Sequence, residues 1–393
     1  MSAVWRTAAM LAFWSSLAAL FYTYLLYPLL LSLGYTAAEL RAAWRRMMRD
    51  PLGPHPAPPR NELALSVVVA AHNEIDRLPD LVQSLRDCDY PEGQVELIVV
   101  SDGSDDGTAA WLQARREPWI RSKVLQRQQG KANALNHGVA LARHDLLVFT
   151  DASTRLLPHS LSMLARHFQN PRVGVVCGLL RFVHNRHSEG TEGVYWGYEC
   201  LLRLMEDRLG ATLTASGAFY ALRRQCYPGL KPTTLIEDFV VPMYARRCGY
   251  QVRYDPEAVA LEFPAATMSG EFARRARLAM GGIRALRDLL GTPLDGVTRW
   301  ALISHKLMRW LTPFFLLAML LSSLALWRQP FFRWLALGQL GVYLWAVTGG
   351  RSWLPGARLA RVTYYFLAMN LALLWGMLRA MRRREETTWQ RAA

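Results

Sequence analysis

Three apolar runs of the sequence each end in a polar cluster whose residue types suit phosphate binding and proton transfer. The clusters are His72-Asn73-Glu74, residues 102–107 (DGSDDG) and residues 151–153 (DAS). Asp102 and Asp151 each stand at the end of an apolar run. One of the two could contact a nucleoside, and the other could bind a divalent cation that bridges phosphates. Carboxylate oxygens of this kind favour Mg²⁺ or Mn²⁺. The alternative for residues 102–107 is an ordinary Asp/Gly turn.

An acidic pair, Glu237 and Asp238, stands at the predicted start of a helix. A carboxylate at this position could take the proton of an acceptor hydroxyl. The alternative is an acidic pair that only stabilises the N-terminus of the helix.

A basic cluster of Arg274, Arg275 and Arg277 could bind a diphosphate through bidentate hydrogen bonds, or could be charge at a membrane edge. On a helix, Arg274 and Arg277 lie three apart and share a face, whereas Arg275 is turned by about 100°. We therefore expect Arg274 and Arg277 to face a diphosphate, and Arg275 to face lipid headgroups or solvent.

The elements that must position these residues alternate in type. Short, β-branched apolar runs alternate with amphipathic segments of helical length between residues 63 and 261. This alternation predicts an α/β fold with a mostly parallel sheet. Ligands of open α/β sheets bind at the carboxyl ends of the parallel strands, so the three polar clusters are expected to converge on one site.

Part of the 52% hydrophobic content belongs in lipid. Residues 8–33 carry no charge and, at 1.5 Å per residue, exceed the roughly 30 Å thickness of the hydrocarbon layer. A cleaved signal peptide is the alternative, but its apolar region is only about 7–15 residues long. The net charge of +15 comes almost entirely from Arg, and many of these residues flank apolar segments, including Arg41, Arg45, Arg46 and Arg49. This pattern predicts that the segment after the first span is cytosolic, and no basic, aromatic-interleaved module suggests nucleic-acid binding.

Apolar segments at residues 307–327, 331–347 and 362–378 predict three further spans. The second is short and carries Arg333, so a re-entrant or interfacial helix is its alternative. Four spans would place Arg382, Arg383 and Arg384 outside, against the positive-inside tendency, and the number of spans stays open. The five scattered cysteines form no C-x-x-C pair and predict free thiols in a reducing compartment.

The order of these motifs over residues 66–282 resembles glycosyltransferase family 2, which includes cellulose, hyaluronan and poly-N-acetylglucosamine synthases. The resemblance rests on the three strand-end clusters, a Gly-Lys-x-x-Ala-Leu-Asn segment at residues 130–136, the acidic pair and the Arg cluster. It implies a GT-A nucleotide-sugar-binding fold flanked by transmembrane helices. It also implies that the donor is bound by Ala71, His72, Asn73, Glu74, Asp102, Gly103, Lys131, Asn136, Asp151, Arg274 and Arg277.

The resemblance further implies that Asp238, with Glu237, supplies the catalytic base and that Asp151 binds Mg²⁺ or Mn²⁺. Two positions depart from the family pattern. Ser153 stands where the second aspartate of the metal motif is usual, which makes it a weak ligand. Leu278 replaces the tryptophan of the final motif, which resembles an acceptor-stacking platform in processive synthases, and Arg274 replaces its glutamine.

The expected function is an inverting glycosyltransferase that moves a sugar from a nucleotide-sugar donor, expected to be a UDP-sugar, to a membrane-associated or growing polysaccharide acceptor. The alternatives are a single-sugar transferase directed to a lipid or polyprenyl phosphate, and a noncatalytic membrane scaffold. A transporter would place ionisable residues in the middle of the membrane, within repeated helix bundles. This sequence instead places its carboxylates in a segment typical of a soluble domain, which argues against a transporter. The expected partners are the donor, a saccharide or lipid-linked acceptor, membrane lipids and export proteins, with no nucleic acid.

The expected localisation is the inner cell membrane, in a multi-pass arrangement with a cytosolic catalytic domain. The expected domains are an anchor with its basic flank at 1–50, a Pro-rich linker at 51–62 and a GT-A catalytic domain at 63–266. Amphipathic interfacial helices with the Arg motif at 267–298, transmembrane segments at 299–380 and a basic tail at 381–393 complete the chain.

Overall fold

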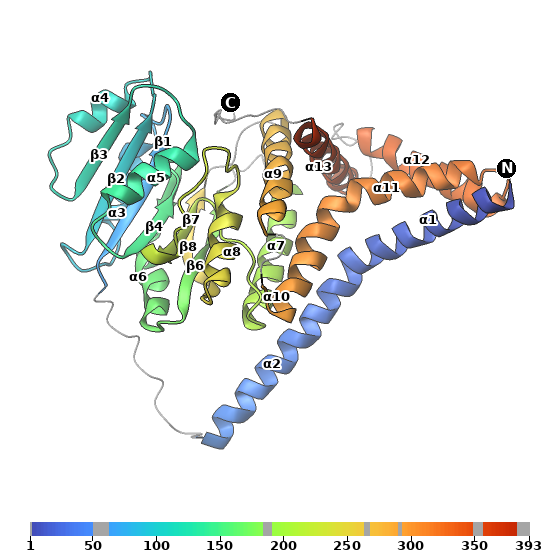
Figure 1. Ribbon diagram of the computed structural model, residues 1–393, viewed down its shortest axis with the longest axis horizontal. Helices are drawn as coiled ribbons and strands as arrows, with labels where there is room; N and C mark the ends of the chain where they lie inside the picture. Colours follow the sequence, from blue (N-terminus) through green and yellow to red (C-terminus); the bar gives the residue numbers. More distant parts are fainter. Residues whose placement is uncertain are drawn as a thin grey trace.

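The centre of the larger body is a mixed, mostly parallel sheet of eight strands (Figure 1). The computed structural model describes residues 2–49, 63–183, 191–262, 268–289, 293–348 and 357–382. The strand order is β3-β2-β1-β4-β7-β6-β8-β5. The strands are β1 (Leu65–Ala71), β2 (Val95–Asp102), β3 (Ile120–Leu125), β4 (Leu146–Thr150), β5 (Thr154–Leu156), β6 (Val173–Phe182), β7 (Phe219–Arg223) and β8 (Gln251–Glu262).

Strands β1 to β4 form a parallel half-sheet, as the alternating pattern predicts. Strand β7 is antiparallel to β4 and β6, β5 is antiparallel to β8, and β6 runs parallel to β8. Alternate residues of each strand pack into two separate cores because successive side chains point to opposite faces. Val67 and Val69 enter one core, whereas Val68 and Ala70 enter the other.

Short helices cover the two faces of the sheet and lead the chain back between strands. They are α3 (Leu78–Arg86), α4 (Thr108–Gln113), α5 (Lys131–Leu141), α6 (Ser160–Ala165), η2 (Arg166–Gln169), η3 (Arg224–Cys226) and α8 (Glu237–Arg247). Helix α8 begins at Glu237, where the sequence predicts a helix start. The carboxyl ends of β1, β2 and β4 lie at one edge of the sheet, which brings the three polar clusters to the same side.

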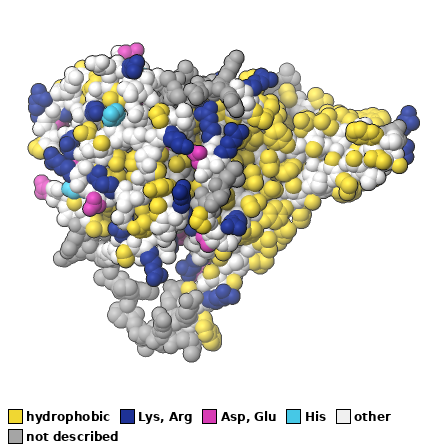
Figure 2. Space-filling model, viewed as in Figure 1, with side chains coloured by type: hydrophobic (Ala, Val, Ile, Leu, Met, Phe, Trp, Pro, Cys, Tyr) yellow, Lys and Arg dark blue, Asp and Glu magenta, His cyan; other side chains and the backbone are white. Residues whose placement is uncertain are grey.

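The remaining helices form a second, tapered body beside the sheet (Figure 1). They are α1 (Ala3–Phe21), η1 (Tyr22–Leu26), α2 (Tyr27–Arg49), α7 (Thr191–Arg208), α9 (Met268–Leu289), α10 (Gly296–Ala301), η4 (Leu302–Leu307), α11 (Met308–Ala325), α12 (Pro330–Thr348) and α13 (Ala357–Met381). Figure 2 shows hydrophobic side chains covering the part of the surface that tapers away from the sheet.

Two continuous helices of the described chain are long and apolar enough to cross a membrane, Ala3–Trp44 and Gly296–Ala325. Both contain a π-helical turn, η1 in the first and η4 in the second, and the two turns lie beside each other. Helices α12 and α13 occupy the positions of the other two predicted spans and are of sufficient length, at 19 and 25 residues, but they are less apolar than the two long helices. The predicted linker at 51–62 and the tail beyond residue 382 lie outside the described residues.

Close packing holds three helices of the tapered body together. Gly376 of α13 lies against the backbone of α9, where an added Cβ would be 2.2 Å from the oxygen of Ala276. Gly282 of α9 similarly packs on the ring of Trp310 in α11. These contacts hold α9, which carries the Arg cluster, against α11 and α13.

Candidate active site

A cavity of about 740 Å³ opens between the edge of the sheet and helices α7, α9, α11 and α13. Its walls bring together six residues that the sequence assigns to the site: Lys131, Asp151, Glu237, Asp238, Arg274 and Arg277. Asp151 comes from the end of β4, Lys131 from the start of α5, and the acidic pair from the start of α8. Segments more than 80 residues apart in sequence thus form one polar wall.

Lys131 links the two ends of this wall. Its Nζ lies 2.8 Å from Oδ1 of Asp151 and 2.7 Å from Oε1 of Glu237. Gly130, with a φ of 95°, turns the chain so that α5 begins at Lys131 and points this side chain into the cavity. Burial lowers the pKa of Lys131, but the charges of Asp151 and Glu237 outweigh this effect and hold the pKa above its ordinary value. Lys131 is therefore a permanent positive charge between two carboxylates.

Asp238 is the half-buried carboxyl of the cavity. Burial and the neighbouring charge of Glu237 raise its pKa to about 6, while Lys131, Arg203 and Lys306 act in the opposite direction. A Cβ built on Gly217 would lie 3.7 Å from the Asp238 carboxyl, so this glycine packs beside it. A carboxyl that lines a cavity and loses its proton near neutral pH is suited to general-base catalysis.

The first polar cluster lies at the same edge of the sheet but outside the lining of the cavity. His72, which follows Ala71 at the end of β1, donates from Nδ1 to the backbone oxygen of Asp102 at 2.8 Å. Asn73 has a φ of 57° and exchanges two hydrogen bonds with Asp105, at 2.7 and 2.9 Å. Glu74 donates its backbone N–H to Oγ1 of Thr108. These contacts join the ends of β1 and β2 into one rigid loop structure.

Asp102 and Asn136 have contacts that differ from the donor contact expected for them. Asp102 is fully buried, and its two carboxylate oxygens accept the backbone N–H groups of Gln129 and Gly130 at 2.7 and 2.8 Å. Asn136 bonds to Tyr227 and to the backbone N–H and oxygen of Leu230. Both side chains therefore support loops of the site, Asp102 the turn before Lys131 and Asn136 the segment that leads to α8.

Gly103 allows the approach of these loops. Its φ is 66°, and an added Cβ would lie 2.4 Å from the backbone nitrogen of Gln128. A side chain at this position would push the loop after β2 away from the turn that positions Lys131. The glycine of the Asp-Gly-Ser turn is thus required by backbone packing.

The Arg cluster corrects one expectation. Arg274 and Arg275 both bind Glu271, at 2.7 and 2.8 Å, and both line the cavity with Arg277. The side chain of Arg275 is only 16% exposed, against 40% for Arg274, and it lines the cavity instead of facing lipid headgroups or solvent as predicted. The reason is Glu271, which lies one turn earlier on α9 and draws both guanidinium groups to the same side. Arg277 has Glu237 among its electrostatic neighbours.

The residues present fit a divalent cation that arrives with the donor. No group of three or more His, Cys, Asp or Glu side chains within the described ranges could hold a metal. Asp151 supplies one carboxylate, and Ser153 lies outside the cavity lining. Mg²⁺ is commonly held by one or two carboxylates together with substrate phosphates. Three carboxyl side chains, those of Asp151, Glu237 and Asp238, line the cavity around the single ammonium group of Lys131. Asp151 would hold such a cation, which would offset the diphosphate charge.

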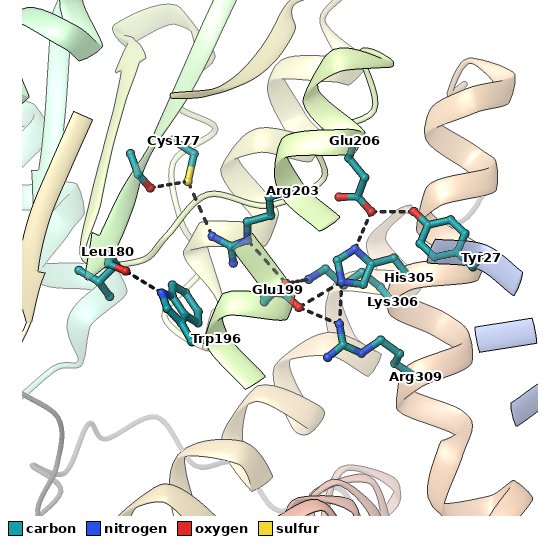
Figure 3. Close-up of polar contacts among 11 residues, drawn as sticks. Tyr27, Cys177, Leu180, Trp196, Glu199, Arg203, Glu206, His305, Lys306 and Arg309 are labelled. Atoms are coloured by element: carbon teal, nitrogen blue, oxygen red, sulfur yellow. Dashed lines mark hydrogen bonds and ion pairs between the residues drawn. The ribbon is translucent and has the colours of Figure 1, made fainter. Parts of the chain in front are cut away.

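The sequence analysis missed a buried ionic network among helices α7, η4 and α11, which also line the cavity (Figure 3). Glu199 of α7 contacts His305, Lys306 and Arg309, which project from η4 and α11. A signal was available, because His305, Lys306 and Arg309 interrupt an otherwise apolar segment. Ionisable residues in such segments generally mark functional sites.

Comparisons with known proteins agree with this architecture. Residues 66–225 match Glycosyl transferase family 2, and residues 146–378 match Glycosyl transferase family group 2. The chain is 29% identical over 283 residues to the poly-beta-1,6-N-acetyl-D-glucosamine synthase of Staphylococcus aureus (strain MSSA476), covering 69% of this chain and 68% of that protein. The synthase of Staphylococcus epidermidis is 29% identical over 240 residues, covering 58% and 57%.

A solved structure shares the fold over most of the chain. It is the mannosyltransferase PcManGT from Pyrobaculum calidifontis in complex with GDP-Man and Mn²⁺, with a TM-score of 0.64 and 21% sequence identity. The match covers 88% of this chain and 98% of that one. The mixed sheet, the helices on its faces and part of the flanking helices therefore follow a known arrangement.

Proposed function

Since the chain belongs to glycosyltransferase family group 2, we propose that it transfers a sugar from a nucleotide-sugar donor to a polysaccharide or membrane-associated acceptor, with Asp238 as the general base. The observation that carries this proposal is the position of Asp238, a carboxyl with a pKa of about 6 that faces the cavity beside Lys131, Asp151 and Glu237. The names of the synthases from the two staphylococci support a polysaccharide product.

The proposed reaction is a single displacement. The hydroxyl oxygen of the acceptor attacks the anomeric carbon of the donor sugar, and its proton passes to the carboxylate of Asp238. The bond between the anomeric carbon and the diphosphate oxygen breaks, and the nucleoside diphosphate leaves with the electron pair. Attack from the face opposite the leaving group inverts the anomeric configuration.

The side chains around Asp238 have distinct proposed roles. Arg277 can form a bidentate contact with the diphosphate, and Lys131 keeps Asp151 and Glu237 in place as charge develops on the leaving group. A bound divalent cation would supply charge compensation for the diphosphate. The loop that contains Ala71, His72 and Asn73 is proposed to bind the nucleoside, and a UDP-sugar is the proposed donor.

We propose that the protein spans the inner cell membrane several times, with the sheet in the cytosol. The apolar helices Ala3–Trp44 and Gly296–Ala325 and the Arg residues that follow the first one support this arrangement. The proposed boundaries are 63–266 for the catalytic domain and 267–298 for the interfacial helices, and we propose that the Arg cluster lies at the junction between water and lipid.

The test uses the purified full chain in detergent with a panel of labelled nucleotide sugars, followed by sizing of the products. One donor should support transfer, and Asp238→Asn should reduce turnover by about 10²- to 10⁴-fold while donor affinity stays within about twofold. A folded Asp238→Asn variant with near-normal turnover would remove Asp238 from the role of base. No transfer or donor hydrolysis with any nucleotide sugar would contradict the proposed function itself.

A further inference from the structure

A cluster of positive side chains surrounds one buried carboxylate, Glu199, among helices α7, η4 and α11 (Figure 3). The Glu199 carboxylate lies 3.2 Å from Nζ of Lys306, 2.7 Å from Nη1 of Arg309 and 3.6 Å from Nε of Arg203. His305 is shared between Glu199 and Glu206, and Tyr27 donates a hydrogen bond to Glu206. Within the described residues, Glu199 therefore faces three permanent cations.

Arg203 is the least satisfied member of this cluster. It is only 7% exposed, and its buried Nε has no hydrogen-bond partner. Its Nη1 reaches only the sulfur of Cys177, at 3.9 Å. A guanidinium has five donors, and within the described residues those of Arg203 meet only the Glu199 carboxylate, in an ion pair of 3.6 Å, and the Cys177 sulfur. The guanidinium also lies 5.2 Å from the centre of the Trp196 ring. Because Arg203 lines the cavity, a ligand with acceptor oxygens could satisfy it from that side.

The position of the cluster indicates what kind of ligand carries those oxygens. Lys306 and Arg309 lie within Gly296–Ala325, one of the two helices able to cross a membrane. Helix α13 contributes a row of apolar residues to the same cavity at a spacing typical of one helix face, namely Val362, Phe366, Met369 and Leu373. The cavity thus combines a cluster of cationic side chains with an apolar wall from α13.

We infer that Arg203, Lys306 and Arg309 bind the phosphate of a lipid that carries the acceptor saccharide, while the face of α13 contacts the lipid chain. Glu199 holds the three cations in position and is not itself a ligand of the phosphate. The inference rests on the proposed function, since it identifies the acceptor of that reaction. The same cavity contains Asp238, so a saccharide attached to the bound phosphate can reach the base.

The test measures binding of radiolabelled hexadecyl phosphate to the full chain in a neutral detergent, with hexadecanol and inorganic phosphate as separate probes. Hexadecyl phosphate should bind at least about tenfold more tightly than either, because only it has both the charge and the chain. Equal binding of hexadecanol would overturn the anion site. Equal binding of inorganic phosphate would overturn the lipid assignment and indicate a soluble anion.

Variants distinguish a phosphate site from a network that only holds helices together. Lys306→Gln should weaken binding of hexadecyl phosphate by about tenfold, and Lys306→Arg should retain it. Glu199→Gln leaves the cations without their counter-charge and should retain or strengthen binding, provided that the variant elutes as the folded protein. Arg299→Gln, which changes a cation on α10 outside the cavity lining, is the matched control and should have no effect. Equal loss of binding in Lys306→Gln and Glu199→Gln would overturn the inference.

These measurements need neither donor nor turnover. Failure of hexadecyl phosphate to bind would leave the proposed glycosyltransferase reaction intact, because donor hydrolysis and transfer to a free oligosaccharide can be followed separately. Absence of donor turnover together with specific binding of hexadecyl phosphate would contradict the proposed reaction and not the lipid site.

Discussion

Replacing Glu237 with Gln should shift the acidic limb of the pH–activity profile to lower pH. Burial, and secondly the charge on Glu237, raise the pKa of Asp238 from 3.8 to about 6. This rise of about two units corresponds to about 3 kcal/mol against the charged form. Glu237→Gln removes the second cause and also frees Lys131 to attract Asp238 more strongly. Both effects lower the pKa, and since burial is the larger cause the shift should be about one unit or less.

The base functions only when deprotonated, so wild-type kcat/KM should fall as the pH drops below about 6. If the variant titrates one unit lower, then at about pH 5 it retains about half of its plateau activity, against about a tenth for the wild type. The assay is kcat/KM for the active donor as a function of pH, with each profile scaled to its own plateau. Asp145→Asn, at a carboxylate whose side chain is 99% exposed, is the control and should leave the profile unchanged. An acidic limb that stays in place or moves upward in Glu237→Gln would refute the electrostatic reasoning.

Three further results are expected. Arg277→Lys should weaken donor affinity by about tenfold, because lysine cannot form the bidentate contact of the guanidinium. Arg275→Lys should mainly lower the melting temperature, because Arg275 binds the buried carboxylate of Glu271 on its own helix. Equal losses of donor affinity in the two variants would contradict these separate roles. Exhaustive chelation should abolish transfer, and Ser153→Asp should lower the Mn²⁺ concentration needed for half-maximal activity; full activity after chelation would exclude a metal role. Gly376→Ala should destabilise the protein by about 1–3 kcal/mol, because the added Cβ would meet the backbone of α9. Gly338→Ala is the control and should not destabilise the protein, because Gly338 has open space around it. Thermal unfolding of both variants measures the difference.

The sequence by itself determined the features that depend on local pattern. Apolar runs with short turns predicted the parallel strands, and the polar residues at their ends predicted which edge of the sheet carries chemistry. The start of α8 at Glu237 and the long apolar helix at the N-terminus also follow from neighbouring residues alone. Such features are set by backbone periodicity and by the order of residue types, which do not require knowledge of distant contacts.

Tertiary structure decided which side chains are free to meet a ligand and which support the fold. Asp102 ends a strand as Asp151 does, yet it is fully buried against the backbone before Lys131, whereas Asp151 lines the cavity. Arg275 turns toward the cavity because a buried carboxylate within α9 attracts it, which outweighs the face expected from helical spacing. The contact between His305 and Glu199 joins residues 106 positions apart. No local pattern contains that pairing, because it arises only when packing of the apolar helices beside the sheet brings α7 and η4 together.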